Sequence, residues 1–216
     1  MNCIVTAGPT YEPLDNVRRM TNFSSGKLGV ELANFLADHG HEVTLLIGEQ
    51  ATYPGERRAA HTRNFSTTAS LREGLMALSG NSINAVFHAA AVSDFAFGTM
   101  WQRSPTGELT AVKAGKISTR EGTLLVELVP TPKLIYELRD WFPNARLIGW
   151  KYEVDGGRDD VLRAARRQLV EAHTDLCVAN GPAYGTGFGL VMIDGEKPVS
   201  DVTALYAELE RVIRQS

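Results

Sequence analysis

Residues 26–48 read "GKLGVELANFLADHGHEVTLLIG", and this stretch decides the fold because a helix pattern in it runs directly into a strand pattern. Four apolar side chains recur at the spacing of one helix face: Leu28, Leu32, Phe35 and Leu36. Gly40 is typical of a helix end, and the apolar run "EVTLLIG" predicts a strand. A second apolar run, "CIVTAG" at residues 3–8, predicts a strand before the helix. Strand, helix and strand in this order form one βαβ unit.

The same alternation continues along the rest of the chain. Further strands are expected at residues 62–67, 84–92, 124–130, 145–154, 175–181 and 190–194. Further helices are expected at residues 71–78, 131–142 and 159–172, with a last one ending at Arg214. Continuously apolar strands are typical of a sheet that helices cover on both faces. We therefore predict an α/β fold in one domain over residues 1–216: a doubly wound, mostly parallel sheet in a Rossmann-like three-layer sandwich.

Residues 95–123 interrupt this alternation. They are rich in Gly, Ser, Thr and charged residues and show little periodicity. A loop of this length inside a compact domain is usually functional. We therefore predict a mobile loop at 95–123 that closes over a bound ligand.

Composition narrows the class of protein. A formal charge of −3 and a pI near 6.0 argue against a nucleic-acid-binding protein. Cys3 and Cys177 lie in apolar, strand-like runs outside any metal or redox motif, which indicates a reducing compartment. Strand-like sequence begins at residue 2, and no apolar run approaches the length of a membrane helix. The prediction is a soluble, cytoplasmic protein without a membrane partner.

The stretch "NVRRMTNFSSGKLG", residues 16–29, predicts an anion site. A helix that begins near Ser25 or Gly26 presents unpaired backbone amides, and Ser24, Ser25 and Lys27 add two hydroxyl donors and a cation. Neither the Walker pattern nor the dinucleotide pattern G-x-G-x-x-G is present. The alternative is that a serine caps the helix, Gly26 is a packing residue and Lys27 is a solvated surface side chain.

Six blocks in this order resemble the phosphopantothenoylcysteine synthetase family: "TAGPTYEPLDNVRRMTNFSSGKLG", "AAAVSDF", "GKIST", "ELVPTPKLI", "GWKYEV" and "DLCVANG". The resemblance implies a homodimeric phosphopantothenate–cysteine ligase of coenzyme A biosynthesis. CTP and Mg²⁺ would activate the carboxylate of 4'-phosphopantothenate as an acyl-cytidylate, and the amine of L-cysteine would displace CMP. The chain resembles the standalone form of the family, which implies a separate phosphopantothenoylcysteine decarboxylase encoded elsewhere.

The resemblance also implies roles for single residues. Lys116 of "GKIST" would contact the nucleotide, with Lys113 as the second choice, unless Lys116 is only a solvated loop residue. Asn22 would handle the acyl-cytidylate, and Arg18 would bind an anionic substrate. The nucleotide would lie against Ser24, Ser25, Gly26, Lys27, His88, Ala89, Ala90, Asp94, Pro132, Lys133, Leu134, Ile135 and Trp150.

The role of Asp94 has an alternative, and some positions differ from the family pattern. Asp94 would serve the ribose or the Mg²⁺ that accompanies the triphosphate, or it is a helix N-cap. The chain departs from the family pattern at five positions. Fused members have a lysine at the positions of Ser118, Thr119, Gln168 and Ala172, and the family has a phenylalanine at the position of Trp150.

Two other functions compete with the ligase. An NAD(P)-dependent short-chain-type reductase or epimerase is suggested by Glu49, which closes the second strand where a ribose-binding acid would lie. No tyrosine in the chain is followed four positions later by lysine, however, and the first turn lacks G-x-x-x-G-x-G. A non-catalytic nucleotide-binding relative is the other alternative. The joint presence of Asn22, Asp94 and Lys116 disfavours it.

Overall fold

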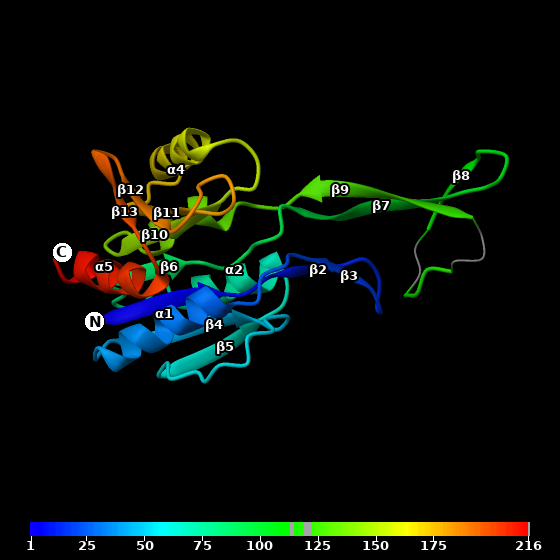
Figure 1. Ribbon diagram of the computed structural model, residues 1–216. Helices are drawn as coiled ribbons and strands as arrows, with labels where there is room; N and C mark the ends of the chain where they lie inside the picture. The colour runs from blue at the N-terminus through cyan, green and yellow to red at the C-terminus, as the bar shows by residue number, and fades with distance from the viewer. Residues whose placement is uncertain (113–114, 119–121, 216) are drawn as a thin grey trace.

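The middle layer of the molecule is an eight-stranded sheet, seen in a computed structural model that describes residues 1–112, 115–118 and 122–215 (Figure 1). The strands follow one another across the sheet in the order β13 (Gly195–Val199), β12 (Phe188–Met192), β11 (Leu176–Asn180), β10 (Arg146–Tyr152), β6 (Ala85–His88), β1 (Asn2–Ala7), β4 (Glu42–Gly48) and β5 (His61–Phe65). Neighbours from β11 to β5 pair in parallel, whereas β12 and β13 add an antiparallel edge. The predicted mostly parallel sheet is confirmed.

Helices cover both faces of the sheet. One face is covered by α1 (Lys27–Asp38) and α5 (Val202–Arg214), whose buried side chains pack with Val5 and Phe87. The other face is covered by α2 (Thr68–Met76), the 3-10 helix η1 (Leu134–Tyr136), α3 (Leu138–Trp141) and α4 (Arg158–Glu171). Side chains of successive strand residues point to opposite faces, so Ile4 packs with α2 while Val5 packs with α1. The three-layer sandwich is therefore as predicted.

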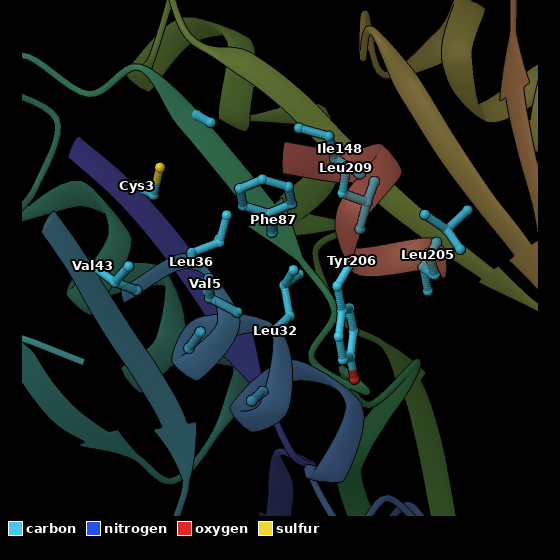
Figure 2. Packing of buried hydrophobic residues seen from close by; sticks show 14 of the residues in the cluster. Cys3, Val5, Leu32, Leu36, Val43, Phe87, Ile148, Leu205, Tyr206 and Leu209 are labelled. Carbon is cyan, nitrogen blue, oxygen red and sulfur yellow. The ribbon is translucent and has the colours of Figure 1, made fainter. Parts of the chain in front are cut away.

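The larger core lies between the sheet and the pair α1 and α5. Figure 2 shows Phe87 of β6 among Leu32 and Leu36 of α1 and Leu205 and Leu209 of α5. All of these side chains are fully buried. Burial of an aromatic ring of this kind typically contributes about 3 kcal/mol, and it holds both helices against the same strand. This core includes residues of both β1 and β6, so it holds the two strands and the two helices together.

The cysteines are buried on opposite faces of the sheet. Cys3 packs with α1, and Cys177 packs with α4. Both are free thiols. Burial raises the pKa of Cys3 to about 11 and that of Cys177 to about 12. Both cysteines therefore behave as small apolar core residues.

The predicted loop at 95–123 is instead largely an antiparallel arm. It consists of β7 (Phe95–Arg103), β8 (Leu109–Ala111) and β9 (Thr123–Pro130), in the order β8–β7–β9, and it extends away from the main sheet (Figure 1). The sequence did not indicate β7 and β8 because both faces of the arm are partly exposed, so no apolar alternation arises. Its mobility stays a prediction, and residues 113–114 and 119–121 lie outside the described residues.

Smaller differences concern the ends of elements. The loop after β1 contains a hairpin of β2 (Tyr11–Pro13) and β3 (Arg19–Thr21), which the sequence did not predict. The helix expected at 131–142 is divided into η1 and α3, and α4 begins and ends one residue before the expected 159–172. Within the described residues, none of the helices combines the length and the apolar character that crossing a membrane requires.

A close approach of α1 to β1 depends on Gly29. A Cβ atom at this position would lie 2.6 Å from the Cβ of Ala7 and 3.1 Å from the carbonyl oxygen of Thr6. Both neighbours belong to the central strand of the sheet and cannot move aside without moving the strand. Any larger residue therefore has to push α1 away from β1.

We expect Gly29→Ala to destabilise the protein by about 1–3 kcal/mol through this overpacking, although alanine favours helices. Gly74→Ala on α2 is the matched control, because a Cβ there would meet only the Leu46 side chain at 3.8 Å. The control should be neutral or stabilising by up to about 1 kcal/mol. Urea unfolding of both variants checks this. Equal changes in the free energy of unfolding would contradict the close contact at Gly29.

Candidate functional site

Most of the predicted site residues lie where the strand order of the sheet reverses, between β1 and β6. From β1 the chain continues to β4 on one side, and from β6 it continues to β10 on the other. The crevice at the carboxyl ends of two such strands is the usual ligand site of an open parallel sheet. The segments after β1, β6 and β10 that were predicted from sequence all begin at this edge.

The segments that leave β1 and β6 stay bonded to each other beyond the strands. The amide of Ala91 donates to the carbonyl of Gly8 at 3.0 Å, and the amide of Thr10 donates to the carbonyl of Ala91 at 3.1 Å. The Thr10 hydroxyl accepts from the Ser93 amide at 2.8 Å and donates to the Ser93 hydroxyl at 3.1 Å. These bonds fix the two exit segments relative to one another, so that side chains on both keep a set spacing.

A first pocket, of about 400 Å³, lies at the amino end of α1. We call it the serine pocket; it is lined by Phe23, Ser24, Ser25, Gly26, Lys27, Leu28, Gly29, Glu31, Ala89, Val202 and Tyr206. Gly26 is the N-cap residue, with a φ of 80°, and no side chain caps the helix in its place. The Ser25 hydroxyl does accept from the Lys27 amide at 3.3 Å. Gly26 therefore takes the capping position that the alternative interpretation gave to a serine.

Glu31 is the acidic residue of the serine pocket. Its carboxylate accepts a hydrogen bond from the hydroxyl of Tyr53 at 2.9 Å and another from that of Tyr206 at 3.3 Å. The Nζ atom of Lys27 lies 3.8 Å from the same carboxylate. Lys27 is thus a long, exposed side chain in a loose ion pair with Glu31. It can turn toward an anion in the pocket.

A second pocket, of about 170 Å³, lies between β6, η1 and β10. We call it the β6–β10 pocket, and its lining residues are His88, Ala90, Val92, Ser93, Asp94, Lys133, Leu134, Ile135, Trp150 and Gln168. Seven of these were predicted to line a nucleotide site from three separate segments. Pro132 is next to the lining residue Lys133, and the preceding Thr131 hydroxyl donates to the Ser93 carbonyl. Lys133 forms an ion pair with Asp94 at this pocket.

His88 is held neutral at the end of β6. Its Nδ1 atom lies 3.1 Å from the hydroxyl of Thr6, which also accepts from the Ala90 amide at 3.0 Å. Burial lowers the pKa of His88 to about 4, because the charged imidazolium would lose its hydration. At neutral pH the β6–β10 pocket therefore has one cationic lining residue in the described part of the chain, Lys133.

Asn22 lies next to the exit segment of β6. Its amide nitrogen donates to the carbonyl of Ala91 at 3.1 Å and to that of Val92 at 3.3 Å. Ala89 lines the serine pocket and Ala90 lines the β6–β10 pocket, so the two pockets lie on either side of one strand end. Asn22 is bonded to the residues that follow directly. The structure thus brings Asn22 together with both predicted binding segments.

Lys116 and Arg18 are placed elsewhere. Arg18 donates to Asp15 and, at 2.9 Å, to the carbonyl of Ile117, so it holds the described segment 115–118. That segment lies toward the outer end of the arm, well separated from β6 and β10 in Figure 1. Lys116 is exposed there. Within one copy of the chain, the predicted lysine and arginine are therefore not part of either pocket. Lys113 and Thr119 lie outside the described residues.

The acidic side chains that the structure describes do not form a metal site of their own. In residues 1–112, 115–118 and 122–215, no three His, Cys, Asp or Glu side chains come together in a way that would hold a metal ion. Asp94 is the one predicted ligand, and it is paired with Lys133. A single carboxylate fits Mg²⁺ only when phosphates and water supply the remaining oxygen ligands. Any Mg²⁺ here would thus arrive with a nucleotide.

Several residues of the site were not identified from the sequence. Asp15 bonds to the amides of Val17 and Arg18, a pattern that the turn-forming "LDNV" sequence could have indicated. Tyr206 of the last helix lines the serine pocket, and the sequence around it contains no motif that would indicate a binding role. Gln168 on α4 and Ala172 directly after it are the two positions where some family members have a lysine. Gln168 lines the β6–β10 pocket, whereas Ala172 is fully buried.

Glu49, which suggested a ribose-binding acid, is engaged by the chain itself. Its carboxylate accepts a hydrogen bond from the hydroxyl of Tyr11 at 3.3 Å, and Tyr11 belongs to the unpredicted hairpin. The hairpin therefore contacts the side chain that a dinucleotide ribose would need. This contact disfavours the reductase alternative.

The fold and its pockets define a class: a Rossmann-like α/β protein with ligand pockets at the switch point of a parallel sheet. Residues 1–192 match the family described as "DNA/pantothenate metabolism flavoprotein C-terminal domain", and the chain belongs to this family. The predicted family is thereby confirmed.

The relatives agree with this assignment. The chain is 34% identical over 197 residues to the coenzyme A biosynthesis bifunctional protein CoaBC of Thermococcus kodakarensis, which covers 89% of this chain and 44% of that protein. The chain thus spans less than half the length of this relative. The solved DNA/pantothenate metabolism flavoprotein from Streptococcus pneumoniae is similar, with a TM-score of 0.86 and 26% identity over 100% of this chain and 99% of that one. The solved C-terminal domain of CoaBC has a TM-score of 0.74 and 25% identity, covering 99% of this chain and 94% of that one.

The neutral state of His88 predicts a pH dependence of stability. A histidine has a pKa near 6.5 in the unfolded chain and, here, about 4 in the folded protein. As the pH falls below 6.5, the unfolded chain binds a proton that the folded protein does not, so stability is lost until about pH 4. The loss from this residue should approach roughly 3 kcal/mol. Urea unfolding between pH 7 and pH 4 measures it, and His88→Gln should show a smaller loss. Equal losses in the two proteins would contradict the neutral, buried imidazole.

Proposed function

We propose that the protein is a phosphopantothenate–cysteine ligase that uses CTP. In the first half-reaction, a carboxylate oxygen of 4'-phosphopantothenate attacks the α-phosphorus of CTP, and pyrophosphate leaves. In the second, the amine of cysteine attacks the carbonyl of the acyl-cytidylate, CMP leaves, and the amine loses a proton as the amide forms. Family membership and a relative named for coenzyme A biosynthesis support this proposal.

The observation that carries the proposal is the pairing of two pockets at one strand end. Predicted nucleotide-lining residues from three segments surround the β6–β10 pocket, and the predicted anion-binding segment surrounds the serine pocket. In the proposed reaction the base and ribose occupy the β6–β10 pocket. Phosphate groups are held by the amides at the start of α1, the two serine hydroxyls and Lys27. The reacting carboxylate then lies beside Asn22.

The bonds of Asn22 restrict its role. Its amide nitrogen donates to two backbone carbonyls, so the amide oxygen is the group that can act on a substrate. An oxygen acceptor suits the attacking amine of cysteine, whose N–H groups need orientation toward the carbonyl. We therefore assign Asn22 to the second half-reaction as an acceptor for the incoming amine, rather than as a donor to the carbonyl oxygen.

Lys116 and Arg18 require a further step, since one copy of the chain keeps them away from the pockets. The arm carries three large, exposed apolar side chains: Phe95, Leu109 and Leu128. The homodimer that the family resemblance implies would cover these side chains. We propose a homodimer in which the arm of one protomer brings Lys116 to the nucleotide bound by its partner. Mg²⁺ enters with the triphosphate, beside Asp94.

One assay separates the candidate functions. Purified protein is incubated with 4'-phosphopantothenate, L-cysteine and Mg²⁺, together with CTP, ATP or NADPH. We expect pyrophosphate and amide product with CTP, and neither when EDTA removes the metal ion. Oxidation of NADPH would instead support the reductase. Nucleotide binding without turnover would support the non-catalytic relative.

Two variants should block different half-reactions. Asn22→Ala should still release pyrophosphate in a single turnover but form the amide roughly 10–100-fold more slowly, because the amine is no longer oriented. Lys116→Gln should slow pyrophosphate release by roughly a hundredfold, because it removes the positive charge that contacts the triphosphate. Quenched reactions analysed by mass spectrometry distinguish the two effects. Accumulation of acyl-cytidylate in Lys116→Gln and none in Asn22→Ala would reverse the assignment.

Mixing the same variants tests the dimer. In a mixed dimer, one of the two sites combines the intact Asn22 of one protomer with the intact Lys116 of the other. Random mixing should therefore restore roughly a quarter of the wild-type activity. Each variant alone, taken through the same mixing procedure, is the control. Activity that stays at the level of the single variants would show that Lys116 serves its own protomer.

A further inference from the structure

Asp15 is an acidic residue that the proposed reaction does not use, and its side chain is fully buried. Its Oδ1 atom accepts from the backbone amides of Val17 at 2.9 Å and Arg18 at 2.8 Å. Its Oδ2 atom accepts from the Nε atom of Arg18 at 3.0 Å and from the Nη2 atom of the same side chain. The paired guanidinium holds the pKa of Asp15 far below its usual range. Asp15 is therefore a carboxylate at neutral pH.

The same carboxylate reaches a segment about a hundred residues away in the chain. Oδ2 also accepts from the backbone amide of Ile117 at 3.1 Å, and Arg18 donates to the Ile117 carbonyl at 2.9 Å. A third bond joins the amide of Asn16 to the carbonyl of Gly115 at 2.9 Å. Both backbone groups of Ile117 are thus held by one ion pair, and the adjacent Lys116 side chain stays exposed.

We propose that Asp15 is a positioning residue: it orients Arg18 and holds residues 115–117 so that Lys116 is presented to the nucleotide. The inference rests on the proposed function, in which Lys116 acts on the triphosphate. It changes the role of Arg18, whose guanidinium is engaged by Asp15 and Ile117 and works by holding the lysine segment rather than by binding substrate. Asp15 itself touches no substrate and acts only through this segment.

The chemistry of the contact explains why the residue is an aspartate. Five N–H donors converge on its two oxygen atoms: two amides of the backbone turn, the Ile117 amide, and the Nε and Nη2 atoms of Arg18. Only a carboxylate accepts at both positions, since an asparagine of the same shape would direct an N–H group at one set of donors. Asp15→Asn should therefore release the segment with little change in side-chain volume.

The test is a double-mutant cycle that combines Asp15→Asn with Lys116→Gln. Asp15→Asn alone should slow single-turnover pyrophosphate release at least about tenfold, as expected when charge-assisted hydrogen bonds are lost. In the Lys116→Gln background the same change should alter the rate by less than about twofold, because the lysine that it positions is gone. A full tenfold loss in that background would overturn the proposal.

A second measurement does not depend on activity. The Ile117 amide, which donates to Asp15, should exchange its hydrogen at least about tenfold faster in Asp15→Asn than in the wild type. Unchanged exchange would overturn the proposal even if the protein is an active ligase. If the wild type releases no pyrophosphate, the proposed function fails, and the exchange rate still decides whether Asp15 holds the segment.

Asp38→Asn is the matched control, since Asp38 also accepts two bonds from one arginine, at 2.9 Å and 2.6 Å from Arg58. That pair is exposed, and neither of its residues lines the serine pocket or the β6–β10 pocket or belongs to the arm. The control should leave pyrophosphate release and Ile117 exchange unchanged. A similar effect of both variants would overturn the specific role of Asp15. Asp15→Asn should still be folded at the assay temperature, as thermal unfolding checks, because none of the three core clusters includes residue 15.

Discussion

The contact between the first turn of α1 and the end of β1 is the constraint on which the site depends. Gly26 begins the helix with a positive φ, and a Cβ atom on it would lie only 3.3 Å from backbone atoms of Gly8. Gly29 removes the side chain that would separate α1 from Ala7. Because these glycines allow the backbones to touch, the amides at the start of α1 lie beside the carboxyl ends of the strands. The serine pocket lies at this approach, with Gly26 and Gly29 among its lining residues.

The exit segments of β1 and β6 convert that contact into a two-part site. Residues next to each other after β6 line different pockets, Ala89 one and Ala90 the other, since alternate residues of an extended chain point to opposite sides. The bonds between Gly8, Thr10, Ala91 and Ser93 keep this arrangement rigid. The residues that line the two pockets at this strand end are therefore held in place relative to Asn22. Such fixed positions are what a reaction between two bound substrates requires.

Much of the fold and part of the site could be predicted because their signals are local. The apolar run of β1 and the helical spacing of α1 depend on neighbouring residues alone. β7 and β8 of the arm could not be predicted, although a strand was expected at residues 124–130 of β9, because β7 pairs with β9 across a long connection and neither of its faces is fully buried. For the same reason nothing in the sequence indicated that Asp15 joins Arg18 to the segment of Lys116, although the resemblance implied roles for both of those residues. Hydrogen bonds between distant segments leave no pattern in either segment.

The two buried cysteines have a consequence for a protein proposed to handle free cysteine. A thiol takes part in thiol–disulfide exchange as the thiolate, and with a pKa of about 11 or 12 only about one molecule in ten thousand, or fewer, is ionised at pH 7. Both sulfur atoms are also shielded from solvent by the core. The protein therefore should not form mixed disulfides with its own proposed substrate. Alkylating reagents added to a reaction would then label the small-molecule thiols and leave the folded protein unmodified.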